Sequence, residues 1–285
     1  MNSYTSTTRS RPAWIRKVGS LLTVGGLVAS ALVAAGLTTA PAAHAAPGDP
    51  FDPSIAQVFV AQGAPTTRLF VAATNGSGET TFTPEGGAAT TQYNAIGFNT
   101  ANNYLYGITN VAAGGIPAQS FVRIGEGNVV TRVGTSTFNN SVLGAFGPAD
   151  GYYYSYIAPF GNAALQVINP ATGALVRTTP LTGATVTGSD FTFADGFFWS
   201  AHPLNGISRT DPATGVTVSF PNSFILPTEP QTAGNTAGAA WTYGNGNLGF
   251  SFNTSGNVYQ VDVTNPASAT PTFTRIAVNP GPASA

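Results

Sequence analysis

A short pattern recurs along the chain at nearly constant spacing: an apolar strand, a tight turn, and a second strand rich in aromatic residues. The turns fall at residues 101, 150, 195 and 245, so successive copies are separated by 49, 45 and 50 residues. Three of the turns are Asp-Gly or Asn-Gly, which favour a type I′ turn because both of its central residues need φ > 0. The spacing therefore predicts one such β-hairpin in each repeat.

A second hairpin is predicted after each of the first ones. Residues 169–173 read Asn-Pro-Ala-Thr-Gly and residues 211–215 read Asp-Pro-Ala-Thr-Gly, each between two apolar runs. Proline presets φ at the second position of such a turn, and glycine takes the left-handed conformation at its end. Residues 125–128 and 265–266 hold the same place in their repeats. Each repeat is thus expected to form four strands.

Four-stranded units of this length are typical of β-propeller blades, because one small sheet has to stack on its neighbours around an axis. The 240 residues that follow residue 45 correspond to about five repeats, with six as the alternative. The first repeat, over residues 55–83, is one strand short. We expect it to lack its first strand, and the C-terminal segment to supply an inner strand that closes the ring. The predicted fold is all-β, a single propeller domain over residues 46–285.

The first 45 residues are predicted to lie outside this fold. A basic stretch that ends at Lys17 precedes an apolar run over residues 21–37, and Ala43-His44-Ala45 matches the small-x-small pattern at which signal peptidase cuts. The apolar run is short and interrupted by glycine, which disfavours a permanent membrane span. We therefore expect residues 1–45 to be a cleaved signal peptide, the protein to be secreted to the extracellular side, and no membrane span to remain after cleavage.

Composition excludes several kinds of partner and cofactor. Charged residues make up 7% of the chain, and it has only 10 lysines and arginines, whereas nucleic-acid binding needs clustered basic residues. The chain has no cysteine, and His202 is the only histidine after residue 45, so a zinc site built from cysteine and histidine is excluded. No catalytic residue is assigned, because no nucleophile-elbow motif or paired Cys-His arrangement is present.

Three segments carry a resemblance to a known family: residues 93–99, 238–253 and 280–284. They resemble an uncharacterised propeller-like domain that occurs in exported and cell-surface proteins, many of them actinobacterial. The likeness extends over residues 51–284. It implies a propeller fold and an extracellular setting, and it implies no activity, because none is established for that family.

Asp190 is the one charged residue among the first-strand positions of the repeats. Its counterparts in the other repeats are apolar: Ile96, Ala145 and Ala240. Because the first strand of a propeller blade lines the central channel, we expect the Asp190 carboxylate to face that channel. A lone carboxylate there needs a cation or several hydrogen-bond donors, and Asn94 and Asn253 are candidates for additional oxygen ligands.

We therefore predict Asp190, Asn94 and Asn253 as ligand-binding residues. The channel leaves room for a bound cation, although no metal ligand is assigned and no other cofactor is predicted. A purely structural, hydrogen-bonded acid is the alternative interpretation of Asp190.

Two functions remain open at the level of sequence. The first is a secreted, monomeric and non-enzymatic propeller that recognises an extracellular glycan or protein through its loops, as a surface-interaction module. The second is a propeller hydrolase or lyase that acts on an extracellular polysaccharide, which for glycoside hydrolysis requires two carboxylates about 5 to 10 Å apart. Whether the protein is an enzyme stays open, and the lack of a catalytic motif favours the first function.

Overall fold

A computed structural model describes residues 46–63, 65–74, 80–147, 150–158, 161–220, 229–230, 232, 234–263 and 272–277. All of them belong to one compact unit, residues 44–285. The predicted signal peptide and the segment 280–284 lie outside the described residues. Among the described residues, no helix is long and apolar enough to span a membrane.

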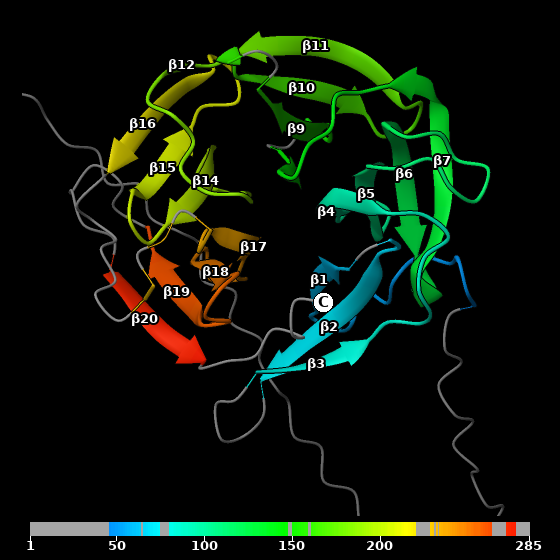
Figure 1. Ribbon diagram of the computed structural model, residues 1–285, viewed down its shortest axis with the longest axis horizontal. Helices are drawn as coiled ribbons and strands as arrows, with labels where there is room; N and C mark the ends of the chain where they lie inside the picture. Colours follow the sequence, from blue (N-terminus) through cyan, green and yellow to red (C-terminus); the bar gives the residue numbers. More distant parts are fainter. Residues whose placement is uncertain are drawn as a thin grey trace, which may run out of the picture. The chain divides into compact units, whose positions relative to one another are not determined.

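The described chain forms five small sheets arranged in a ring, so the predicted five-bladed propeller is confirmed (Figure 1). Within each blade the strands are named here from the central channel outwards. Blade 1 contains β1 (Val58–Gln62), β2 (Arg68–Thr74) and β3 (Thr80–Pro84). Blade 2 contains β4 (Tyr93–Asn99), β5 (Tyr104–Thr109), β6 (Ser120–Gly125) and β7 (Val129–Thr137), with the 3-10 helix η1 (Glu126–Asn128) between the last two.

The remaining blades follow the same order. Blade 3 contains β8 (Gly144–Phe146), β9 (Tyr153–Ile157), β10 (Ala164–Asn169) and β11 (Ala174–Pro180). Blade 4 contains β13 (Thr192–Ala194), β14 (Phe197–His202), β15 (Gly206–Thr210) and β16 (Val216–Phe220), and the short β12 (Thr182–Gly183) pairs in parallel with β16 at the outer edge. Blade 5 contains β17 (Ala237–Thr242), β18 (Leu248–Phe252), β19 (Val258–Asp262) and β20 (Thr272–Ala277).

The first hairpin of each repeat is present, but its turn type varies. Asp195 and Gly196 both have positive φ, 49° and 86°, as a type I′ turn requires. Gly151 and Gly246 also have positive φ, but Asp150 and Asn245, which precede them, do not. The type I′ prediction is therefore wrong for Asp150-Gly151 and Asn245-Gly246.

The two Pro-Ala-Thr-Gly hairpins have the same geometry, as predicted. The N–H of Gly173 donates to the carbonyl of Asn169, and the N–H of Gly215 donates to the carbonyl of Asp211, both at 2.8 Å. Gly173 and Gly215 have φ of 67° and 74°. Gly173 also packs closely against the neighbouring blade, because a Cβ there would lie 2.1 Å from the carbonyl oxygen of Val133.

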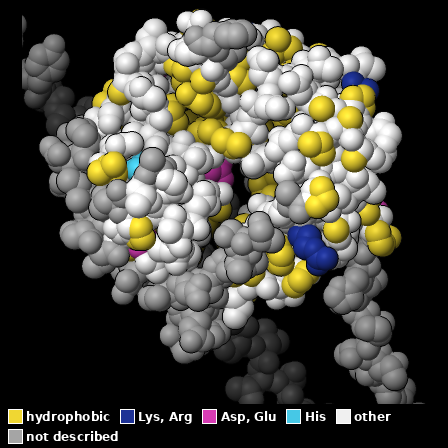
Figure 2. Space-filling view, in the orientation of Figure 1, with side chains coloured by type: hydrophobic (Ala, Val, Ile, Leu, Met, Phe, Trp, Pro, Cys, Tyr) yellow, Lys and Arg dark blue, Asp and Glu magenta, His cyan; other side chains and the backbone are white. Residues whose placement is uncertain are grey.

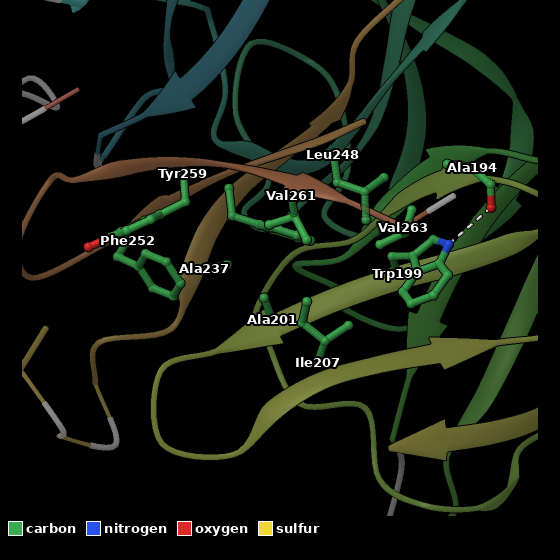
Figure 3. Close-up of a cluster of buried hydrophobic side chains, with 11 residues drawn as sticks. Ala194, Trp199, Ala201, Ile207, Ala237, Leu248, Phe252, Tyr259, Val261 and Val263 are labelled. Atoms are coloured by element: carbon green, nitrogen blue, oxygen red, sulfur yellow. Dashed lines mark hydrogen bonds between the residues drawn. The ribbon is translucent and has the colours of Figure 1, made fainter. Parts of the chain in front are cut away.

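The hydrophobic core consists of clusters between neighbouring blades. In Figure 3, Trp199 of blade 4 belongs to the same cluster as Leu248 and Val261 of blade 5, and its indole N–H donates to the carbonyl of Ala194 at 3.0 Å. Burial of one such side chain stabilises the fold by about 1.5 to 3 kcal/mol. The other clusters join blades 1 and 2 through Leu69 and Ile124, blades 2 and 3 through Ile108 and Tyr153, and blades 3 and 4 through Tyr154 and Phe198.

Blade 1 has three strands, as predicted, but the missing strand is not the inner one. β1 lines the central cavity together with the first strands of the other blades. The described C-terminal strand, β20, pairs with β19 at the outside of blade 5 and supplies no inner strand to blade 1. The prediction of ring closure was wrong because a sequence pattern counts strands and does not show which strand lies nearest the axis.

Two carboxylates meet where blade 1 approaches blade 2. Glu85 follows β3, and its carboxylate accepts a hydrogen bond from the N–H of Gly127 at 3.1 Å. Glu126 lies in η1 and forms a hydrogen bond with Glu85. Burial, followed by the hydrogen bond and the negative charge of Glu85, raises the pKa of Glu126 to about 7. Nearby Asp52 adds a smaller repulsion, while its backbone N–H lowers this pKa.

The turn glycines provide a test of the hairpin register. We expect Gly151→Val and Gly196→Val each to lower the free energy of unfolding by about 1 to 3 kcal/mol, because a β-branched residue is strained at positive φ. Nothing lies within 4 Å of a Cβ at either position, so backbone strain rather than a steric clash would cause the loss of stability. Gly244 is the matched control, since its φ is not positive and its surroundings are equally open. Urea unfolding that finds Gly151→Val and Gly196→Val as stable as Gly244→Val contradicts the assignment.

The carboxylate pair predicts a pH dependence of stability. The folded state holds the proton of Glu126 more tightly than the unfolded chain, where the ordinary pKa is 4.5. The tighter binding of this proton stabilises the folded state. This stabilisation is complete below about pH 4.5 and is lost as the pH rises through about 7. We therefore expect the Tm to fall between pH 5 and pH 8, and Glu126→Gln to reduce that fall. Asp195→Asn, at an exposed turn of blade 4, is the control. An equal fall in wild type and Glu126→Gln would refute the prediction.

Candidate functional site

A cavity of about 370 Å³ lies where the innermost strands of the five blades face one another. Its wall is built from β1, β4, β8, β13 and β17 and from residues next to them. Figure 2 shows the molecule hollowed near the middle of this face, with an acidic side chain at the edge of the hollow. Five parts of the chain that are distant in sequence thus surround one space.

Most of the described residues that line the cavity are apolar, and one of them, Asp190, is charged. Apolar side chains come from every blade, including several aromatic residues. The aromatic residues are Phe59, Phe98, Phe146, Phe191, Phe193 and Trp241. The neutral polar residues are Gln57, Asn94, Thr100, Thr192 and Thr242.

Side chains form hydrogen bonds with some of the backbone groups that lie along the unpaired edges of the innermost strands. A strand at the edge of a sheet leaves backbone N–H and C=O groups without a strand partner. The hydroxyl of Thr242 donates to the carbonyl of Phe193 at 2.8 Å, and the hydroxyl of Tyr153 donates to the carbonyl of Ala95. The hydroxyls of Thr192 and Thr242 lie 2.8 Å apart, which links blade 4 to blade 5.

Asp190 bridges the same two blades. It lies two residues before β13, so it is not within the strand in which the sequence pattern had placed it. One carboxylate oxygen, Oδ1, accepts the N–H of Phe191 at 2.8 Å, and Oδ2 accepts the N–H of Ala240 on β17 at 3.2 Å. The residue is half-buried and lines the cavity. Burial raises its pKa well above the usual range, and the two N–H groups oppose this effect.

The other two predicted ligand-binding residues have different positions. Asn94 lies on β4 and lines the cavity, and its Oδ1 accepts the N–H of Ala95 at 2.8 Å. Asn253 follows β18, the second strand of its blade, and is not among the residues that line the cavity. Its N–H donates to the carbonyl of Thr236 at 3.1 Å. The structure therefore brings Asn94 and Asp190 to one cavity and leaves Asn253 outside it. The ligand-binding role of all three stays a prediction.

Sequence reasoning missed the pair Thr192 and Thr242. A signal was available for Thr192, because it follows Asp190 by two residues and side chains two apart along an extended segment share a face. Thr242 could not have been found in this way, because its contact with Thr192 depends on how blade 5 stacks on blade 4.

Glu229 is the buried carboxylate of the described part of blade 5, with an exposed fraction of 3%. Its Oε1 accepts the hydroxyl of Tyr259 at 2.7 Å and the amide N–H of Asn257, and its Oε2 accepts the amide N–H of Asn235 at 3.3 Å. Burial raises the pKa of Glu229, but hydrogen bonds from Ser255, Asn257, Tyr259 and Asn235 outweigh it and leave the pKa lowered. This acid holds the segment around residue 229 to the β18–β19 hairpin, and it does not line the central cavity.

The geometry of the described cavity wall fits hydrogen bonding and binding of one positive group. Its single carboxylate is oriented by backbone donors from two blades and still has surface on the cavity. Among the described residues, no group of three or more histidine, cysteine, aspartate or glutamate side chains is placed to hold a metal ion.

Comparisons with known proteins agree with the fold. No curated protein matches the chain by sequence. The solved structure of glutaminyl cyclase from Myxococcus xanthus is similar, with 12% identity, a TM-score of 0.51, and coverage of 76% of this chain and 86% of that one. A virginiamycin B lyase from Staphylococcus aureus has 16% identity, a TM-score of 0.43, and coverage of 79% and 70%. At these identities the likeness shows the fold alone.

The family match extends over most of the propeller. Residues 59–285 match a family described as a repeat of unknown function, DUF6923. The matched segment begins within β1 and contains the strands that follow it in all five sheets. The chain therefore belongs to the DUF6923 family of repeats of unknown function.

Proposed function

We propose that this protein is a secreted, non-enzymatic recognition module that binds an extracellular glycan or protein ligand at the mouth of its central cavity. The observation that carries this proposal is the cavity itself, about 370 Å³ in volume, walled by all five blades and containing one oriented carboxylate. Ligand sites are typically concave and mostly apolar, with a few polar groups that orient the ligand.

Packing between neighbouring blades supports the innermost strands. Buried clusters join blades 1 to 2, 2 to 3, 3 to 4 and 4 to 5, so the innermost strands are held by packing on neighbouring blades. A binding site on regular strands keeps its geometry better than one on loops. We propose that the protein acts as a monomer, because the five blades form their ring within a single chain.

The positions and hydrogen bonds of the described carboxylates favour recognition over polysaccharide cleavage. The described wall offers one carboxylate, Asp190, whereas cleavage of a glycosidic bond generally uses two. Glu229 is already bonded to several donors elsewhere in blade 5, and Glu85 and Glu126 bond to each other between blades 1 and 2.

Secretion can be tested directly. When the full chain is expressed in an exporting bacterial host, we expect protein in the medium to begin at Ala46. Replacement of Ala43 and Ala45 by glutamine removes the small side chains of the cleavage pattern and should block processing. N-terminal sequencing distinguishes the outcomes, and wild-type protein in the medium that still carries residues 1–45 would contradict the proposal.

Recognition through the cavity predicts the effect of a substitution at its wall. The purified protein is screened on arrays of glycans and extracellular matrix proteins, and the ligands that bind are then measured against two variants. Gln57→Trp places a bulky ring at a half-buried wall residue, and Thr178→Trp places the same ring on the exposed outer strand β11. We expect Gln57→Trp to weaken binding about tenfold or more at an unchanged Tm, and Thr178→Trp to bind as wild type does. Equal binding by both variants would exclude the cavity as the site.

A further inference from the structure

We infer that the central cavity binds a primary amine, whose ammonium group pairs with the Asp190 carboxylate while its hydrocarbon chain packs against the apolar wall. The inference rests on the proposed function and names the chemical group of the ligand that enters the cavity. On a protein partner, that group is a lysine side chain or an N-terminus.

As a first argument, the hydrogen bonds of Asn94 and Asp190 show whether the position of Asp190 requires a negative charge. Asn94 and Asp190 perform the same local task, because Oδ1 of each accepts the N–H of the next residue at 2.8 Å. Both line the same cavity. Since a neutral amide is sufficient for this task in blade 2, the local turn alone does not require a negative charge in blade 4. The additional bond from Ala240, at 3.2 Å, is at the long end of the normal range.

The second argument is the lack of a compensating charge in the described wall. No arginine or lysine is among the described residues that line the cavity. The guanidinium group of Arg123 lies over the ring of Tyr104 at 4.3 Å, and that of Arg209 lies over the ring of Phe197 at 4.4 Å. A carboxylate that is partly removed from water is costly unless a cation or a proton neutralises it. Burial accordingly raises the pKa of Asp190, so a cationic ligand would compete with a proton for the same carboxylate.

The third argument distinguishes an ammonium group from a metal ion. Calcium prefers six to eight oxygen ligands, and the described residues place no group of three acidic or histidine side chains together. An ammonium group has three N–H donors and is attracted to aromatic rings. Besides Asp190, the wall offers it the hydroxyls of Thr192 and Thr242 and the rings of Phe193 and Trp241.

The size of the cavity and the lack of lysine after residue 45 also fit an amine ligand from outside the protein. A volume of about 370 Å³ is at the small end of ligand pockets, and it suits an amine on a short hydrocarbon chain. The only lysine of the chain is Lys17, in the predicted signal peptide. The secreted protein would therefore carry no lysine, and its N-terminus would be the one primary amine of its own that could enter the sites of neighbouring copies.

Calorimetric titration of the purified protein with n-pentylamine tests the inference. We expect n-pentylamine to bind about tenfold or more tightly than n-pentanol, which has the same chain and no charge. The affinity for the amine should rise with pH, because burial raises the pKa of Asp190 and the amine stays charged while this carboxylate loses its proton. The affinity for pentanol should not follow this rise, and calcium chloride should not displace the amine.

Two variants make the assignment specific. Asp190→Asn should weaken amine binding about tenfold or more and leave the weak binding of pentanol unchanged. Asn94→Asp adds a charge at the residue of blade 2 that makes the same local hydrogen bond, and it should strengthen amine binding. The Tm of each variant is measured alongside. If Asp190→Asn does not fold, two tests of amine binding remain. They are the comparison of pentylamine with pentanol in the wild type and the amine affinity of Asn94→Asp.

Failure of this inference differs from failure of the proposed function. No binding of the amine, equal affinity for amine and alcohol, or displacement of the amine by calcium overturns the inference. If an array ligand nevertheless binds and is lost in Gln57→Trp, recognition at the cavity stands and its ligand is not an amine. If Gln57→Trp has no effect on the array ligand, the proposed function fails whatever the amine does.

Discussion

Each blade of this protein has two faces that only another blade can cover. A sheet of three to five short strands directs side chains alternately to both faces, and it is too small to bury either face by itself. All four buried clusters among the described residues accordingly lie between neighbouring blades. The chain contains no cysteine, so no disulfide shares this task. Stability therefore depends on the stacking of blades, and each hairpin depends on its neighbours.

The same stacking produces the cavity. The innermost strand of each blade keeps an edge without a strand partner, and five such edges face one another around the axis. Side chains satisfy part of these edges and at the same time tie blades together, as Asp190 does between blades 4 and 5. Hydrogen bonding between blades and the wall of the cavity therefore share residues, as Asp190, Thr192 and Thr242 show.

Local features of the fold could be predicted because they depend on the conformations of a few adjacent residues. Asp195-Gly196 requires a tight turn, and the two Pro-Ala-Thr-Gly segments close their hairpins with a left-handed glycine. The turn around Gly246 shows the limit, since the prediction of positive φ was correct for Gly246 and wrong for Asn245. Asp190 was recognisable as a charge in an apolar series. Its bond to Ala240, and the position of Asn253 outside the cavity, depend on contacts between strands that sequence spacing does not describe.

The amino-acid sequence by itself determined the number of repeats, the hairpins within them and the shortage of charge, because turn residues and strand periodicity act over a few neighbouring residues. Only the tertiary structure decided which strand of blade 1 faces the axis and which polar side chains share the cavity. These arrangements are set by packing and hydrogen bonds between different blades, such as the bond between Asp190 and Ala240, which are 50 residues apart. The sequence pattern does not predict these contacts between blades, because many arrangements of the blades are compatible with one pattern of strands.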